Sequence, residues 1–356
     1  MIFEMKKILK TPLVWLFFLL SFVVLFLPFL FSQFNQYEFS ITMMLDSQLN
    51  QVGFELMGDP ENEFNLAQRH YLEEMLSGIN LEDNERVLRA ELSHLAFLQT
   101  QDPALVMTGV REFDFDKDQA VLSSLLERGL PYVLPRTPVR DLPLMQYWQE
   151  FFLENTSLYL IMLALFIVTI ITNEKRGTSQ DLAGITPISL MNVLAKRMLA
   201  TLSVVLSLFI VPFVLVSLVI TFLNGFGSWS YPIYINAQLH DIGSLLLQNI
   251  GMLILWLIVY SLAGFLLNYL TGSFPITLGI VLFVSVFLQT IYLQNPRMIG
   301  RAVMALRNSF VFSQGIFGIG GVGAEAFFSN SVLGLLVAST LFAFGSVVYV
   351  KKAGRI

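Results

Sequence analysis

Residues Pro12–Phe31, "PLVWLFFLLSFVVLFLPFLF", form an almost purely apolar segment near the N-terminus. It contains no charged residue over a length that suffices for an α-helix to cross a bilayer. Lys6, Lys7 and Lys10 precede it, as cations precede the apolar core of a signal peptide. The apolar run is too long for a signal peptide, and no small-x-small cleavage site follows it. The stretch therefore predicts an uncleaved first membrane helix.

Five later segments have the same character. The six predicted spans are Pro12–Phe31, Phe151–Thr172, Leu199–Leu223, Leu245–Leu267, Phe274–Leu293 and Ser331–Val350. The whole chain is 55% hydrophobic and only 13% charged, whereas soluble domains carry about 25% charged residues. Composition thus excludes an ordinary soluble protein and indicates an integral membrane protein. The absence of cysteine excludes disulfides and Cys-ligated zinc.

The distribution of Lys and Arg predicts the orientation of the chain in the membrane. With the N-terminus in the cytoplasm, the inner segments hold ten of them, namely Lys6, Lys7, Lys10, Lys175, Arg176, Lys196, Arg197, Lys351, Lys352 and Arg355. The short outer loops hold three, Arg297, Arg301 and Arg307. This distribution satisfies the positive-inside rule, which the inverted topology violates. We therefore expect both termini in the cytoplasm, in the plasma membrane of a bacterium.

The segment 32–150 is long enough to form an extracytoplasmic domain. It carries 20 Asp and Glu against 8 Lys and Arg, a balance of −12. Apolar residues near helical spacing predict one helix within "NLEDNERVLRAELSHLAFLQTQDP", on Leu81, Val87, Leu88, Leu92 and Leu95. A second helix is predicted over "DKDQAVLSSLLERG", with Leu122, Leu125 and Leu126 on one face and Gly129 beyond its end.

These observations predict an all-α polytopic membrane protein with a mainly helical outer domain. The expected divisions are 1–31 (N-terminal segment and first span), 32–150 (outer domain), 151–172 (second span), 173–198 (cytoplasmic coupling loop), 199–223, 245–267 and 274–293 (third to fifth spans), 294–330 (outer re-entrant or amphipathic segment) and 331–356 (sixth span and tail). The segment 294–330 combines "NPRMIGRAVMALRNSF" with apolar sequence too broken by glycine to span.

Enzyme chemistry finds little support in the sequence. The spans are nearly free of charge, with Glu154 at the outer edge of the second, so no intramembrane proton relay or metal site is expected. Neutral polar residues within or beside the spans, Gln248, Asn249, Asn268 and Gln289, are expected to mediate helix packing.

Motifs for cofactors are equally weak. "GIGGVG" at Gly318–Gly323 opens no βαβ unit, and no P-loop occurs, so we expect no cofactor in this chain. His70 with Glu73 and Glu74 could present metal-binding atoms on one helix face, but we favour a solvated surface. Nothing in the sequence indicates nucleic-acid binding.

The loop Asn173–Arg197, "NEKRGTSQDLAGITPISLMNVLAKR", has unusually complete helix boundaries. Gly177 is placed to end the second span, and Thr178 with Asp181 forms a capping box. Gly184 can end that short helix, and Thr186-Pro187 can begin the next as N-cap and first helical residue. The loop is therefore predicted to hold one short rigid helix. A plain helix–loop–helix connection remains an equal alternative.

The order of residues in this loop resembles the second-to-third-span loop of the ABC type-2 exporter permeases. That family shows a Glu, Gly-Thr, a Leu, a Pro with a following Ser, and a basic residue that enters the third span. The matching residues, in order, are Glu174, Gly177, Thr178, Leu182, Pro187, Ser189 and Lys196. Six spans with a large outer domain after the first are also similar to that family. The N-terminal amphipathic helix of many relatives is shortened to "MIFEMKKILK", and no ATPase domain is fused.

The resemblance implies a permease subunit without enzymatic activity of its own. A second, identical or related permease subunit would pack beside it, and separate ATPase subunits would hold ATP and Mg. The loop residues implied to contact the ATPase are Glu174, Lys175, Arg176, Gly177, Thr178, Asp181, Leu182, Pro187, Ser189 and Lys196. Charge-poor spans favour a hydrophobic or amphipathic cargo such as a peptide, lipid or drug.

Two other functions remain open from the sequence. A membrane-anchored receptor could use its acidic outer domain to bind a cationic peptide. An ATP-independent secondary transporter is disfavoured, because the spans lack ionisable coupling residues and no inverted repeat is detectable.

Overall fold

The computed structural model describes residues 2–34, 41–101, 115–134, 137–152, 156–173, 190–235, 238–271, 273, 275–281, 345 and 348. The chain divides into two compact units. One, the apolar unit, comprises Met1–Pro28, Trp148–Gly225 and Leu246–Ile356. The other, the inserted unit, comprises Phe29–Tyr147 and Phe226–Leu245.

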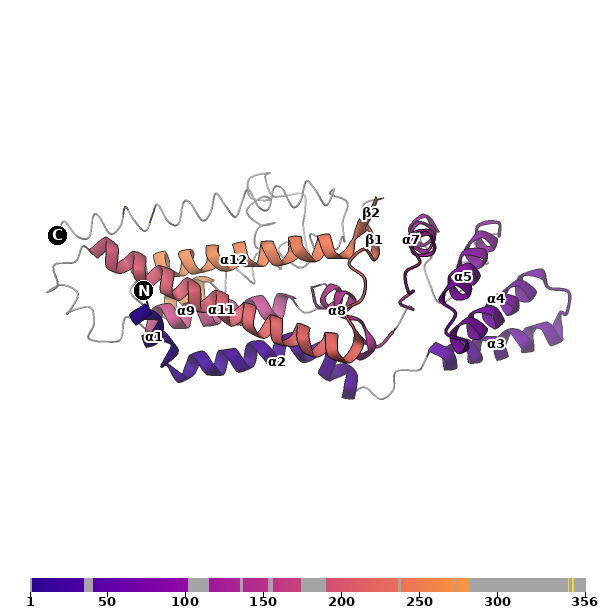
Figure 1. The fold of residues 1–356 in the computed structure, drawn as a ribbon, viewed down its shortest axis with the longest axis horizontal. Helices are drawn as coiled ribbons and strands as arrows, with labels where there is room; N and C mark the ends of the chain where they lie inside the picture. The colour runs from indigo at the N-terminus through magenta and orange to yellow at the C-terminus, as the bar shows by residue number, and fades with distance from the viewer. Residues whose placement is uncertain are drawn as a thin grey trace. The chain divides into compact units, whose positions relative to one another are not determined.

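The apolar unit is built from long helices that run side by side (Figure 1). The long helices are α2 (Pro12–Phe34), α9 (Thr156–Asn173), α11 (Leu190–Asn224) and α12 (Ile242–Thr271). The short helices α1 (Ile2–Leu9) and α8 (Leu144–Glu150) precede α2 and α9. The ends of α2 and α8 and the beginning of α12 cross the boundary with the inserted unit.

Three of these helices are long and apolar enough to cross a membrane. Their apolar segments are Pro12–Gln33, Ala195–Asn224 and Ile242–Asn268, which match the predicted first, third and fourth spans. Helix α9, at the place of the predicted second span, holds a shorter apolar segment, Met162–Ile171, among the residues whose side chains are described. Of the predicted fifth span only 275–281 is described, as helix, and of the sixth only two residues.

The junction between α1 and α2 has a clear local cause. Thr11 ends the first helical segment, with its N–H donating to the Ile8 carbonyl at 3.0 Å. Pro12 then begins α2, in the first helical turn, where its missing N–H removes no hydrogen bond within the helix. The indole N–H of Trp15 donates to the Leu9 carbonyl at 3.0 Å, which satisfies a free carbonyl at the end of α1.

The inserted unit is mainly helical, as predicted. It contains α3 (Ile41–Gly58), α4 (Glu63–Asn80), α5 (Asn84–Gln99), α7 (Phe115–Arg128) and the 3₁₀ turn η1 (Val139–Asp141). Its core lies where α3, α4 and α5 meet and is formed by Leu45, Leu72, Met75, Val87 and Ala90.

Both helices predicted in this unit are present. Helix α5 is capped by Asp83, whose side chain accepts from the Arg86 N–H, and Val87, Leu88 and Leu95 are buried. Leu81 was expected on the apolar face, but it precedes the cap and is exposed. That prediction was wrong because the periodicity was extended across the turn before the helix.

Helix α7 ends as its sequence predicts. Gly129 adopts φ +60°, and its N–H donates to the Leu126 carbonyl at 3.2 Å. The Leu130 N–H donates to the Leu125 carbonyl at 3.0 Å. This pair of bonds is a Schellman motif, which favours glycine at the left-handed position.

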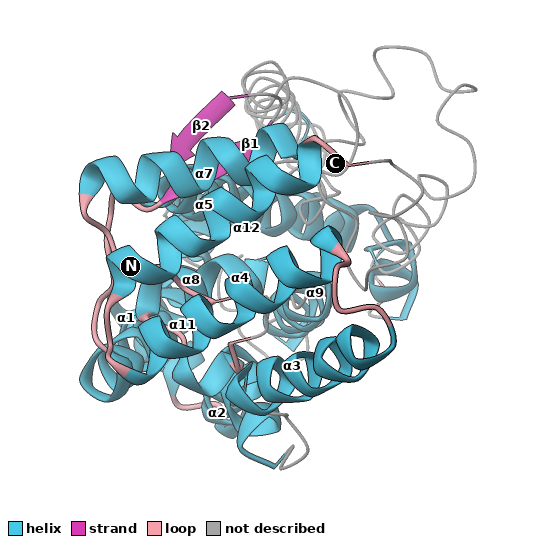
Figure 2. Ribbon diagram, turned by 90° about the vertical axis from the view of Figure 1, so that its right-hand side faces the viewer, coloured by secondary structure: helices cyan, strands magenta, loops and turns pink. Residues whose placement is uncertain are grey.

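A two-stranded antiparallel hairpin departs from the predicted all-α class. Strands β1 (Pro232–Ile235) and β2 (Gln238–Asp241) pair with Ile233 opposite His240 (Figure 2). The hairpin packs on α7, where Arg128 Nη1 lies 2.6 Å from both Asp241 Oδ1 and the Ser230 carbonyl. The segment 226–245 is therefore part of the inserted unit and not a free loop.

Candidate functional site

Most of the predicted coupling loop lies outside the described residues. Nine of its ten candidate residues, Glu174, Lys175, Arg176, Gly177, Thr178, Asp181, Leu182, Pro187 and Ser189, fall in this part of the chain. Lys196 is described, and it is exposed near the beginning of α11. Helix α11 starts at Leu190, so it continues from the loop into the predicted third span without interruption.

One end of the apolar unit is basic. Helix α1 packs against α11 near the beginning of that helix (Figure 1), and Lys6, Lys10 and Lys196 are exposed. The buried Nε of Arg197 has no hydrogen-bond partner in the described part of the chain. Exposed cations thus lie just before α2 and in the second turn of α11.

In the interior of this unit, three helices meet at a polar junction that the sequence did not predict. The Ser21 hydroxyl of α2 lies 2.8 Å from the Tyr159 hydroxyl of α9 and donates to the Leu208 carbonyl of α11 at 3.1 Å. Leu208 is the residue four positions before Pro212, which lies inside α11. Because proline has no N–H, it cannot donate to this carbonyl. Ser21 therefore replaces the hydrogen bond that Pro212 removes.

This Ser21 junction is enclosed by aromatic rings. Tyr159 contacts Phe151 and Phe209 with centroid distances of 6.0 and 6.2 Å, and Phe209 contacts Phe213 at 5.5 Å. Ser21 and Tyr159 are at most 1% exposed. In such surroundings a lost hydrogen bond cannot be replaced by water. The signals available in the sequence were Pro212 inside an apolar run and Ser21 as the single hydroxyl residue of Pro12–Phe31.

Further neutral polar groups lie along α12. Asn268 Nδ2 donates to the Ile171 carbonyl of α9 at 3.2 Å, a packing role of the kind expected from the sequence. Asn249 Nδ2 and Trp256 Nε1 are buried without a hydrogen-bond partner among the described residues. They are seven residues apart and so lie on one face of α12. These neutral donors can bind uncharged polar groups. Helices α2, α9 and α12 carry no Asp, Glu, His, Lys or Arg.

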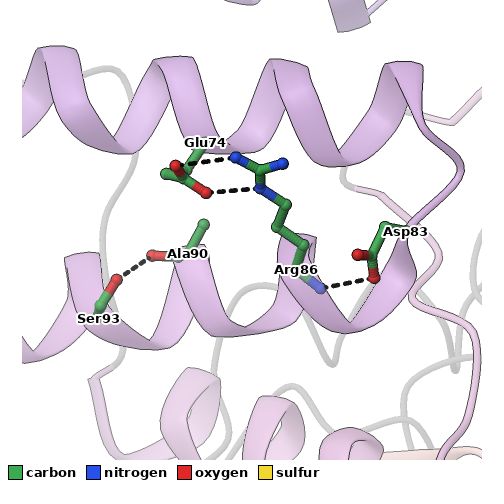
Figure 3. A network of polar contacts seen from close by, with 5 residues as sticks. All are labelled: Glu74, Asp83, Arg86, Ala90 and Ser93. Atoms are coloured by element: carbon green, nitrogen blue, oxygen red, sulfur yellow. Dashed lines mark hydrogen bonds and ion pairs between the residues drawn. The ribbon is translucent and has the colours of Figure 1, made fainter.

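Several charged residues of α4 and α5 are joined in ion pairs. Arg86 Nε and Nη2 donate to the two carboxylate oxygens of Glu74 at 2.7 and 3.0 Å, beside the Asp83 cap (Figure 3). This bidentate pairing lowers the pKa of the Glu74 carboxyl. Glu73 pairs with Arg69 at 2.7 Å. Both carboxylates of the metal alternative are thus bound to arginines, and no His, Asp or Glu group suited to a metal occurs among the described residues.

One buried histidine belongs to the same helices. The ring of His94 on α5 stacks on Tyr71 of α4 with centroids 3.8 Å apart, and the Tyr71 hydroxyl donates to Glu91 at 2.6 Å. Burial lowers the pKa of His94 from 6.5 to about 4. The imidazole is therefore neutral at pH 7 and contributes to helix packing.

No family model, curated protein or solved structure matches this chain.

Proposed function

We propose that this chain is the permease subunit of an ATP-driven ABC exporter in a bacterial plasma membrane. Both termini are cytoplasmic, the inserted unit is extracytoplasmic, and the cargo is hydrophobic or amphipathic. The observation that carries the proposal is the basic end of the apolar unit. Lys6 of α1, Lys10 directly after that helix and Lys196 of α11 are exposed, and α1 packs against α11. Lys196 itself belongs to the segment predicted as the coupling loop. Cations in such a position favour the cytoplasmic side.

The length of α11 supports a mechanical role for the loop. A helix of 35 residues begins directly after Ser189 and carries Lys196 in its second turn. A push on the loop would therefore be transmitted along the segment of α11 that precedes Pro212, which includes Leu208. The Ser21 junction joins α11 to α2 and α9, so the same movement would reach two further helices. ATP and Mg would be bound by separate ATPase subunits, and a second permease subunit would complete the pathway.

Co-purification tests this proposal. The tagged full-length chain is extracted from its native membrane in a mild detergent, and the bound proteins are identified by mass spectrometry. A P-loop ATPase in stoichiometric amount is expected. Glu174→Ala and Gly177→Pro should then abolish cargo-stimulated ATP hydrolysis, while the matched control Glu85→Ala, in the inserted unit, should leave it unchanged. Absence of an ATPase, or full coupling in both loop variants, would refute the proposal.

A receptor is the second candidate, and the acidic inserted unit favours it. The segment Ile41–Gln68 carries five carboxylates and neither Lys nor Arg. A receptor would purify without a stoichiometric ATPase, so the same experiment separates the two functions.

A further inference from the structure

Helix α11 keeps an exposed apolar face along its second half. Exposed apolar residues recur there every three or four positions, namely Val211, Val214, Leu218 and Phe222. The segment Ala195–Asn224 is long and apolar enough to cross a membrane. Lipid tails are as apolar as these side chains, so a spanning helix can turn such a face toward them. Phe222, in the last turn of α11, is exposed by 89%.

Two further aromatic side chains follow directly after α11 in the sequence. Phe226 and Trp229 are exposed by 46% and 47%, in the loop that leads from α11 to β1. Gly225 and Gly227 turn the chain there, with φ of +80° and +78°, values that favour glycine. Phe226 is thus only two residues beyond Asn224, where the apolar segment of α11 ends.

The same loop is fixed to the beginning of α12. The Gly243 N–H donates to the Trp229 carbonyl at 3.0 Å, and the Ile242 N–H donates to the Tyr231 carbonyl at 2.9 Å. The Trp229 ring lies against Gly243, where a Cβ would overlap it. The apolar segment of α12 begins at Ile242. Trp229 is therefore held where one candidate span begins, and Phe226 follows the point where another ends.

This part of the inserted unit is free of charge. The chain contains no Asp, Glu, Lys or Arg from Met198 to His240. The next charged residue, Asp241, is paired with Arg128. The segment 32–150, in contrast, carries 20 Asp and Glu against 8 Lys and Arg. An uncharged aromatic surface can enter the boundary layer of a bilayer, whereas a carboxylate would lose hydration there and be repelled by anionic lipids.

We propose that Phe226 and Trp229 anchor the inserted unit in the headgroup layer of the membrane leaflet on its side. At that depth the Trp229 ring would contact acyl chains while its N–H meets headgroup oxygens or water. Lipid is favoured over a second copy of the chain, because both residues adjoin the ends of apolar spans that lipid surrounds. The proposal rests on α11 and α12 crossing the membrane and is independent of the exporter function.

The chain has no cysteine, so single thiols can report the depth of this loop. Phe226→Cys and, separately, Trp229→Cys are labelled with a nitroxide in the full-length chain in phosphatidylcholine nanodiscs. Power-saturation EPR compares collisions with oxygen, which concentrates in lipid, and with a water-soluble nickel chelate. We expect oxygen to dominate at both positions, as at Phe222→Cys. Met57→Cys, at an exposed apolar residue of α3 in the same unit, should be dominated by nickel.

Substitutions of Trp229 then test its role as an anchor. Trp229→Ser should shift the label at position 226 toward the nickel chelate, and Trp229→Tyr should restore the oxygen signal. Phe54→Ser, at an exposed aromatic residue of α3, is the matched control and should have no effect. Circular dichroism of each variant verifies folding.

Two results at positions 226 and 229 would overturn the proposal. Dominant nickel collisions would show that the loop lies in water, and weak collisions with both reagents would show that protein covers it. Dominant nickel collisions at Phe222→Cys as well would refute the span in α11 and the proposal with it, whereas co-purification of an ATPase tests the exporter function separately.

Discussion

Removal of the Ser21 hydroxyl should destabilise the apolar unit through a carbonyl on another helix. In Ser21→Ala the Leu208 carbonyl loses its donor, and Pro212 cannot supply one. The Tyr159 hydroxyl loses a 2.8 Å hydrogen bond in the same change. Buried polar groups left unpaired cost about 1–3 kcal/mol, and hydrogen bonds between membrane helices contribute about 0.6–1.7 kcal/mol. We expect Ser21→Ala to lower the free energy of unfolding by about 1–2 kcal/mol.

A double-mutant cycle isolates the role of the proline. Pro212→Ala restores an N–H four residues after Leu208, so the helix can bond its own carbonyl. The cost of Ser21→Ala should then fall by about 1 kcal/mol, which is a coupling energy measurable between contacting sites. Ser207→Ala is the matched control, because its hydroxyl donates only to the Ser203 carbonyl within α11.

Unfolding of the full-length chain by SDS in mixed micelles, followed by circular dichroism, gives these free energies. Ser207→Ala should change the free energy of unfolding by less than about 0.5 kcal/mol. If Ser21→Ala costs the same with and without Pro212, the hydroxyl does not replace the lost helical bond, and the reasoning is wrong.

Three shorter predictions concern the inserted unit. Folding lowers the pKa of His94 from 6.5 to about 4, so between these pH values the unfolded state binds a proton that the folded state does not. The free energy of unfolding should therefore fall as pH drops from 6.5 toward 4, by at most about 3 kcal/mol. Denaturation from pH 7 to 4 should show this loss in the wild type and in exposed His70→Gln, and a much smaller loss in His94→Gln. Gly243→Ala should lower the thermal midpoint, because the added Cβ would overlap the Trp229 ring. Such overpacking costs about 1–3 kcal/mol of stability. Arg128→Ala should accelerate amide exchange in the β1–β2 hairpin; unchanged exchange would show that its ion pair does not hold the hairpin.

Helices were predicted best from the sequence where one local feature, such as a terminal glycine or an unbroken apolar run, marks them. Gly129 and the apolar spacing before it located the end of α7, and unbroken apolar runs located α2, α11 and α12. The error at Leu81 came from periodicity alone, since the Asp83 cap fixes the beginning of α5 two residues later. Local signals therefore fix helix existence more reliably than helix boundaries.

Features that depend on contacts across the chain were missed. Ser21 and Leu208 are 187 positions apart. No local sequence pattern reveals that the Ser21 hydroxyl donates the hydrogen bond that the Leu208 carbonyl loses because of Pro212. The hairpin was missed because its strands have only four residues each and lie between two long apolar helices. "YPIYI" carries the aromatic and β-branched residues typical of a strand, which is the signal that could have located it.

The exporter proposal requires the loop before α11 to rest on an ATPase, and a site-specific crosslink can detect that contact. Leu182→Cys in this cysteine-free chain is labelled with benzophenone-maleimide in native membranes and irradiated, with Glu85→Cys as the control position. We predict a covalent adduct between the Leu182 position and a P-loop ATPase, identified by mass spectrometry, and none from the control. An ATPase adduct at neither position, or equal adducts at both, would contradict the claim.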